Sequence, residues 1–120
     1  MRFTAHKGRI RLSLRVCRQG RDLQVLLDGG AAHLGAVALA AAPAPGTEAQ
    51  GDLLVLPGHR EDALALRMAK RLAAALGCAV CVSAGIHYPD ITREEIAVAE
   101  ALTDVLTSRC LAALRKETAC

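Results

Sequence analysis

The chain has 120 residues, of which 52% are hydrophobic, and a formal net charge of +3. A chain of this length buries one core and has no room for a second domain, so we expect a single domain over residues 1–120. With one Phe, one Tyr and no Trp, it lacks the aromatic surface on which single-stranded nucleic acids usually stack. The mild positive charge permits an anionic partner without requiring one.

The sequence shows no targeting or membrane segment. Its first residues, MRFTAHKGRIRLSLRV, alternate apolar and charged side chains and do not resemble a signal peptide. The longest weakly polar run, Leu34 to Pro45, is too short to span a membrane and is broken by glycine and proline. We therefore expect a cytoplasmic protein whose partners are neither membranes nor nucleic acids.

The five cysteines are odd in number and scattered, which is typical of free thiols rather than of a disulfide framework. Cys78 and Cys81 have CxxC spacing, but they lie in a run with the composition of a β-strand. Residues three apart on a strand point to opposite faces, so the two sulfurs would not converge on one metal ion. We interpret both as structural.

Five stretches have the composition or the alternation of β-strands. The first is the clearest, because apolar residues at every second position alternate with Arg or Ser. The second returns from a turn at residues 19–22 and forms a hairpin with the first. The expected strands cover residues 9–16, 23–28, 33–42, 53–56 and 78–84.

Two stretches have helical periodicity. From Glu61 to Leu76, apolar residues fall four apart on one side, and Gly77 stands where a helix ends. Thr92 and Glu95 form a capping box that opens a last helix, which we expect to run to about Lys116. The expected apolar stripes are Leu64, Met68, Leu72 and Leu76 in the first helix, and Ile96, Ala99, Leu102, Leu106, Cys110 and Ala113 in the second.

The order β-β-β-β-α-β-α predicts an α+β fold, in which an antiparallel or mixed five-stranded sheet carries two amphipathic helices on one face. The other face of the sheet is either exposed to solvent or covered by a second copy of the chain. Because the central strands are so apolar, we expect a homodimer.

Polar residues that stand beside glycines follow or precede three of the strands. His33 comes after Gly29 and Gly30, the run Pro57 to Arg60 follows the fourth strand, and His87 follows Gly85. His59 and Arg60 stand at a helix start, where free N–H groups and the helix dipole favour an anion such as phosphate. Arg60 can add a bidentate contact. These residues are candidates for one ligand site.

Each of these residues also has a purely structural interpretation. Pro57 and Gly58 are common in turns, and His59 can cap a helix. His33 beside an apolar strand, or His87 in a loop, can be satisfied locally, although three histidines together can also bind a metal. Arg9, Arg11, Arg15 and Arg18 are interpreted as a solvated face rather than a nucleic-acid footprint. The motifs GxSxG, HExxH, GxGxxG and the P-loop are absent, which argues against catalysis.

Three blocks of sequence carry a family resemblance. They are Gly29–Gly30 with His33 to Leu39, then LPGHRED from Leu56 to Asp62, then AGIH from Ala84 to His87. Together they resemble the LpdD-like prenylated flavin chaperone family, which is related to a component of gallate decarboxylase, and the resemblance covers nearly the whole chain. The PGHRED and GIH blocks are its specific part.

The resemblance implies a non-catalytic chaperone that binds prenylated FMN, the product of a UbiX-type prenyltransferase, and assists maturation of a UbiD-type decarboxylase. It also suggests a fold like that of proteasome assembly chaperones. Carried onto this sequence, the binding residues are His33, Gly58, His59, Arg60 and His87, with Gly35 and Gly85 as backbone neighbours. Whether a metal takes part is left open.

Two other functions remain open from the residues alone. One is an assembly module without a ligand, in which the histidines are structural. The other is a small metal-dependent enzyme that uses His33, His59 and His87 as ligands.

Overall fold

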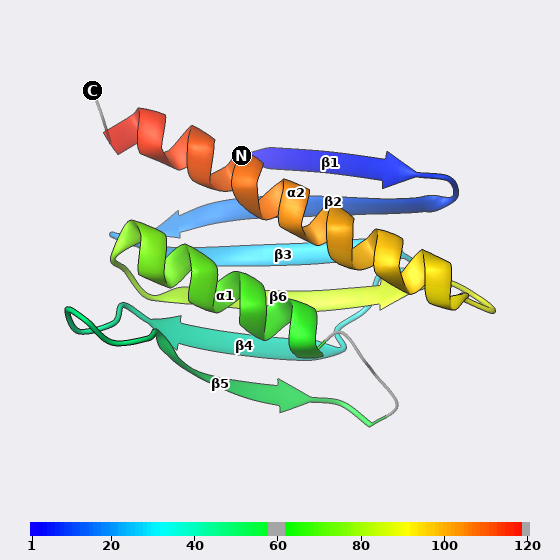
Figure 1. Ribbon diagram of the computed structural model, residues 1–120, viewed down its shortest axis with the longest axis horizontal. Coiled ribbons are helices and arrows are strands. Elements are labelled where there is room, and N and C mark those ends of the chain that lie inside the picture. The colour runs from blue at the N-terminus through cyan, green and yellow to red at the C-terminus, as the bar shows by residue number, and fades with distance from the viewer. Residues whose placement is uncertain (58–61, 119–120) are drawn as a thin grey trace.

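The computed structural model describes residues 1–57 and 62–118, which form one sheet and two helices. The elements are β1 (Arg2–Lys7), β2 (Ile10–Gln19), β3 (Asp22–Gly30), β4 (Ala36–Ala41), β5 (Gln50–Val55), α1 (Asp62–Leu76), β6 (Val80–His87) and α2 (Arg93–Thr118). Figure 1 shows both helices on the same face of the sheet, with the opposite face free of helices.

The sheet has the strand order β1-β2-β3-β6-β4-β5. All neighbouring strands are antiparallel except β3 and β6, which run parallel. The last strand of the chain is therefore inserted between β3 and β4, and helix α1 is part of the connection from β5 back to β6 (Figure 1). The α+β class, the mixed sheet and the helices on one face are confirmed.

The predicted number of strands was wrong, because the sheet has six strands rather than five. The missed strand, β1, has the sequence RFTAHK and lies at an edge of the sheet. Only Phe3 and Ala5 bring apolar side chains to the helix-covered face, where they pair with Leu14 and Leu12. Two apolar residues between charged ones are too weak a pattern to predict a strand.

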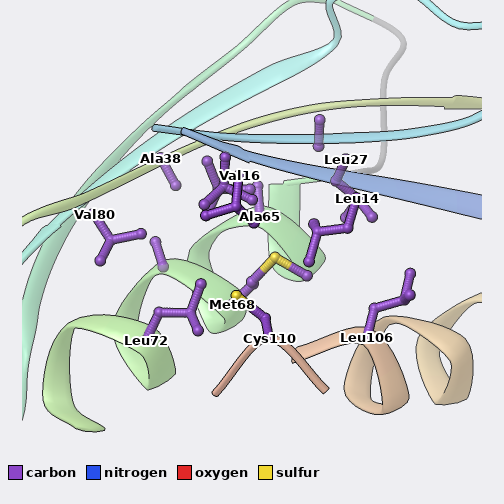
Figure 2. Packing of buried hydrophobic residues seen from close by; sticks show 14 of the residues in the cluster. Leu14, Val16, Leu27, Ala38, Ala65, Met68, Leu72, Val80, Leu106 and Cys110 are labelled. Carbon is purple, nitrogen blue, oxygen red and sulfur yellow. The ribbon is translucent and has the colours of Figure 1, made fainter. Parts of the chain in front are cut away.

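The core lies between the helix-covered face of the sheet and the two helices. Alternate residues of β2, β3, β4 and β6 are almost fully buried there, and Figure 2 shows Met68 and Leu72 of α1 and Leu106 and Cys110 of α2 packed toward the sheet. Strand residues in this core include Leu12, Leu14, Val25, Leu27, Ala38, Val80 and Val82. Every second residue of these strands therefore packs against the apolar side of the two helices, and together they form one core layer.

The stripe predicted for α2 is correct in its centre but not at its ends. Leu102, Leu106 and Cys110 are buried, whereas the side chain of Ile96 is 37% exposed. The buried side of α2 instead includes Thr103 and Thr107, whose hydroxyls donate to carbonyl oxygens one turn earlier at 2.8 and 2.7 Å. A threonine satisfied in this way can face the core, so polarity alone misplaced the stripe.

The N-terminus of α2 is fixed by its cap and by an arginine from the first hairpin. Thr92 Oγ1 accepts from the Glu95 N–H, and Glu95 Oε1 accepts from the Thr92 N–H, each at 3.1 Å, which confirms the predicted capping box. Arg9 donates to both oxygens of Glu95 at 2.6 and 2.9 Å. The Tyr88 hydroxyl bonds the backbone N–H and C=O of Arg11, both at 2.7 Å. These contacts join the turn between β6 and α2 to the β1–β2 hairpin.

The predicted arginine face divides between the two sides of the sheet. Arg11 and Arg15 alternate with the buried residues of β2 and so lie on the helix-free face. Arg9 and Arg18 instead form ion pairs with Glu95 and Glu117 of α2. The four side chains therefore do not form one continuous stripe.

The cysteines of the described residues are free thiols. Cys78 is buried just before β6, which begins at Val80 rather than at the predicted residue 78. Burial raises the pKa of its thiol, and burial raises the pKa of Cys110 to about 11. Thiols held in the protonated form are poor nucleophiles and poor metal ligands, in agreement with a structural role.

Candidate functional site

Four predicted site residues, His33, Gly35, Gly85 and His87, lie at one end of the sheet, where β3 and β6 finish and β4 begins. The register pairs Gly30 with His87, and Ala36 with both Ala84 and Val55. We call this region, residues 31–35 with Gly85 and His87, the histidine end of the sheet. In Figure 1 it lies at the arrowhead ends of β3 and β6.

The segment 31–35 is fixed to the neighbouring strands by backbone hydrogen bonds. The Ala31 N–H donates to the His87 carbonyl at 3.0 Å, and the Gly35 N–H donates to the Ala84 carbonyl at 2.9 Å. The Leu56 N–H in turn donates to the Gly35 carbonyl at 2.9 Å. The loop that carries His33 is therefore attached to β6 on one side and to the end of β5 on the other.

Gly85 is required where the chain crosses β6. A Cβ atom at this position would lie 1.5 Å from the His33 carbonyl oxygen, so no side chain fits between the strand and the segment above it. Gly85 alternates with Val82 and Ala84 of the core, which places His33 over the helix-free face. Gly30 has a similar role, because its φ is +64° and a Cβ would lie 2.0 Å from the His87 carbonyl oxygen.

The two histidines approach each other across this crossing. Their ring centroids are 6.4 Å apart with the planes nearly perpendicular, at 80°. His33 is half-buried and its Nδ1 lies 3.0 Å from the Ala31 carbonyl oxygen, whereas His87 is exposed. The structure thus brings together His33, Gly35, Gly85 and His87, four of the seven predicted site residues.

Gly58, His59 and Arg60 lie outside the described residues. The described chain stops before them at Pro57 and resumes at Asp62. Because Leu56 is bonded to Gly35, the chain leaves β5 for these residues at the histidine end.

The helix-free face beside the histidine end is partly apolar. Two residues before Gly85 on β6 is Ser83, which lies on the same face of the sheet. The register aligns four residues across neighbouring strands at this level: Leu26, Ser83, Val37 and Leu54. Asp28 lies beside Gly85 on β3, and its carboxylate is 3.9 Å from the Arg15 guanidinium. These neighbours were missed, because they become adjacent only when β6 enters between β3 and β4.

Other features of the structure do not coincide with the predicted residues. Within the two described ranges, no group of three or more His, Cys, Asp and Glu side chains is arranged to hold a metal ion. An open cavity of about 520 Å³ lies between β1 and α2, lined by Thr4, Ala5, His6, Arg11, Leu102, Val105 and Arg109. The helices in the described part of the chain are too short or too polar to cross a bilayer.

The fold is shared with a chain of a solved assembly chaperone complex. A solved structure titled as a novel chaperone complex for yeast 20S proteasome assembly contains a chain that superposes with a TM-score of 0.66. The match covers 98% of this chain and 94% of that chain at 16% identity, and it shows a common fold.

The family follows from sequence. Residues 6–115 match the prenylated flavin chaperone LpdD-like domain. The chain is also 32% identical, over 103 residues, to Protein LpdD of Lactiplantibacillus plantarum, which covers 80% of this chain and 71% of the relative. The chain therefore belongs to the LpdD-like chaperone family, as its sequence blocks predict.

Proposed function

We propose that this protein is a non-catalytic chaperone that binds prenylated FMN and assists maturation of a UbiD-type decarboxylase in the cytoplasm. Family membership supports the chaperone role and the ligand class. The observation that carries the proposal is the crossing of residues 31–35 over Gly85, which brings His33 and His87 together beside an apolar row of the helix-free face.

The proposed roles divide between the two ends of the ligand. Gly58, His59 and Arg60 bind the phosphate, since a helix start and an arginine both favour an anion. His33 and His87 border the isoalloxazine ring. Gly35 and Gly85 are buried and act indirectly, because Gly85 lets residues 31–35 lie on β6 and so positions His33. The bound flavin would supply a reactive ring system. This chain would hold and protect the ring but would not use it for catalysis.

The ring would rest on aliphatic rather than aromatic side chains. Phe3 packs against the core, and the Tyr88 hydroxyl is engaged with Arg11. Leu26 and Val37 instead flank Ser83, which is two residues from Gly85 on the same face of the sheet. Leu26 is 38% exposed. An aliphatic surface of this kind stabilises an apolar ligand by burial without the geometry of ring stacking.

We also propose that the protein is a homodimer. Leu39 and Leu54 lie on the helix-free face and are 57% and 80% exposed. Exposed apolar side chains gathered on one sheet face are typical of an interface between subunits. A second copy would cover this face as the helices cover the other.

The experiment that tests the function is delivery of the cofactor. An apo UbiD-type decarboxylase is mixed with a limiting amount of prenylated FMN, with and without this protein, under anaerobic conditions. We expect the protein to raise the fraction of active decarboxylase severalfold, and to show no decarboxylase activity by itself. An unchanged active fraction would contradict the chaperone role, and bovine serum albumin at equal concentration controls for nonspecific protection.

A further inference from the structure

The edge strand β5 has a row of backbone groups that face away from the sheet. Residues of an antiparallel pair alternate between those that bond the neighbouring strand and those that point outward. The Leu56 N–H donates to Gly35, and β5 pairs with β4 in the same register. Gln50, Asp52 and Leu54 therefore bond β4, whereas the N–H and C=O groups of Gly51, Leu53 and Val55 point away from the sheet.

The side chains along this edge are mostly apolar and exposed. Leu54 is 80% exposed, Val55 is 40% exposed and Leu56 is 51% exposed. The strand sequence QGDLLV contains no Lys, Arg or Pro, and its one charge is Asp52. Edge strands are ordinarily protected from pairing by charges, prolines, bulges or a covering element. Among the described residues, β5 has only the Asp52 charge for that purpose.

The opposite edge of the same sheet is protected. The Met1–Val16 backbone bonds and the register of β1 with β2 leave Arg2, Thr4 and His6 with outward-facing backbone. Arg109 of α2 donates to the Thr4 carbonyl at 2.8 Å, so one of these groups is already bonded. The sequence of β1 also carries Arg2, His6 and Lys7. One edge of the sheet is therefore charged and contacted by α2. The other is mostly apolar and, in the part of the chain that the structure describes, pairs with no further strand.

We propose that β5 is a docking site to which an extended segment of the client protein adds as a seventh strand. This inference rests on the proposed function, because it assumes that the chain serves a client. Backbone bonds to Leu53 and Val55 would provide the affinity. Across from Leu54 the segment would place an apolar residue, and across from Asp52 a Lys or Arg.

The position and the size of this edge favour a client segment over a second copy of the chain. The strand leads directly into Leu56, which is bonded to Gly35, so a docked segment would end beside the histidine end. A pairing of two short edge strands alone is smaller than the roughly 1,200 Å² of total surface that stable interfaces bury. A strand pairing of this small size is suited to a transient contact, which forms and dissociates while the flavin is passed to the client.

The test uses the full chain and a labelled synthetic peptide of about eight residues, with alternating valine and threonine and one lysine placed to face Asp52. Val55→Pro removes one outward N–H and leaves the β4 bonds intact, since proline is tolerated at such edge positions. Val55→Thr is the matched control, because it keeps the N–H and the branched side chain. Two further peptides carry N-methyl groups on alternate residues, one set facing β5 and the other facing solvent.

We expect binding to wild type and to Val55→Thr, and at least a tenfold loss in Val55→Pro with an unchanged melting temperature. N-methylation toward β5 should abolish binding, and N-methylation away from it should not. Equal binding by all variants and peptides would overturn the proposal, as would a Val55→Pro chain that loses only self-association. Flavin titration of the same variants separates the two proposals, because loss of the docking edge leaves flavin binding unchanged.

Discussion

The glycine beneath His33 is the residue on which the geometry of the site most depends. Gly85 lets the backbone of residues 31–35 lie directly on β6, and the two histidines meet because of that crossing. His33, Gly35, Gly85 and His87 could be predicted as neighbours because each stands beside a strand end in the sequence. The contact of the Gly85 backbone with His33 could not, because nothing in a single glycine indicates what crosses it.

Gly85→Ala should destabilise the fold by about 2 kcal/mol or more, since the new methyl group would overlap the His33 carbonyl and the segment would have to move. Gly20→Ala is the control. It also replaces a glycine, at a φ of +62° but with no atom within 4 Å of the added Cβ, and should cost only about 1 kcal/mol. Urea unfolding measures both. A Gly85→Ala chain no less stable than Gly20→Ala would contradict the crossing.

At the scale of elements, the sequence predicts what is local. The capping box of α2 follows from a short-range pattern and is confirmed, and the predicted α1 stripe is confirmed at Met68 and Leu72, whereas Leu64 and Leu76 are only partly buried. The strand β1 could not be predicted in this way, because its two inward-facing apolar residues form a recognisable pattern only when they are paired with Leu12 and Leu14 of β2. The ion pair of Arg9 with Glu95 likewise joins residues that are distant in the chain and adjacent only after α2 packs beside the first hairpin.

This ion pair gives the fold a defined response to acid. Hydrogen bonds from Arg9 and Thr92 lower the pKa of Glu95 from 4.5 to about 2. A carboxylate whose pKa is lowered by folding stabilises the protein above its unfolded pKa, and this stabilisation is lost as the pH falls through the folded pKa. The melting temperature of wild type should therefore exceed that of Glu95→Gln at pH 7, and the difference should shrink between about pH 4.5 and pH 2.

The control for this prediction is Glu94→Gln, which changes an exposed carboxylate in the same helical turn. It should lower the melting temperature less than Glu95→Gln does. A Glu95→Gln difference that is constant from pH 7 to pH 2 would show that the Arg9 pair does not stabilise the fold through its charge.

At the scale of the whole molecule, the arrangement of the sheet explains both proposed surfaces. Insertion of β6 between β3 and β4 brings Gly85 beside Asp28 and leaves β5 as an edge. The sequence predicts the class of fold but not this order, because strand order depends on pairings between distant segments. The exposed leucines of the helix-free face are likewise recognised only when that order is known.

Leu39→Lys should convert the proposed homodimer to a monomer, because it places a charge on the helix-free face at a position that is 57% exposed. Val105→Lys, at an exposed position on α2, should leave the dimer intact. Analytical ultracentrifugation measures both. A wild-type chain that sediments as a monomer at high concentration, or a dimer that persists in Leu39→Lys, would contradict the proposed interface.

The central claim is tested most directly by anaerobic spectral titration of the purified protein with prenylated FMN, FMN and riboflavin. The control Arg67→Ala removes an exposed arginine of α1 that pairs with Asp104. We predict tight binding that prefers prenylated FMN and persists in Arg67→Ala. In His59→Ala and Arg60→Ala it should weaken far more for FMN than for riboflavin. Absence of binding to either phosphorylated flavin would contradict the account, and equal losses for FMN and riboflavin would contradict the assignment of the phosphate to Arg60.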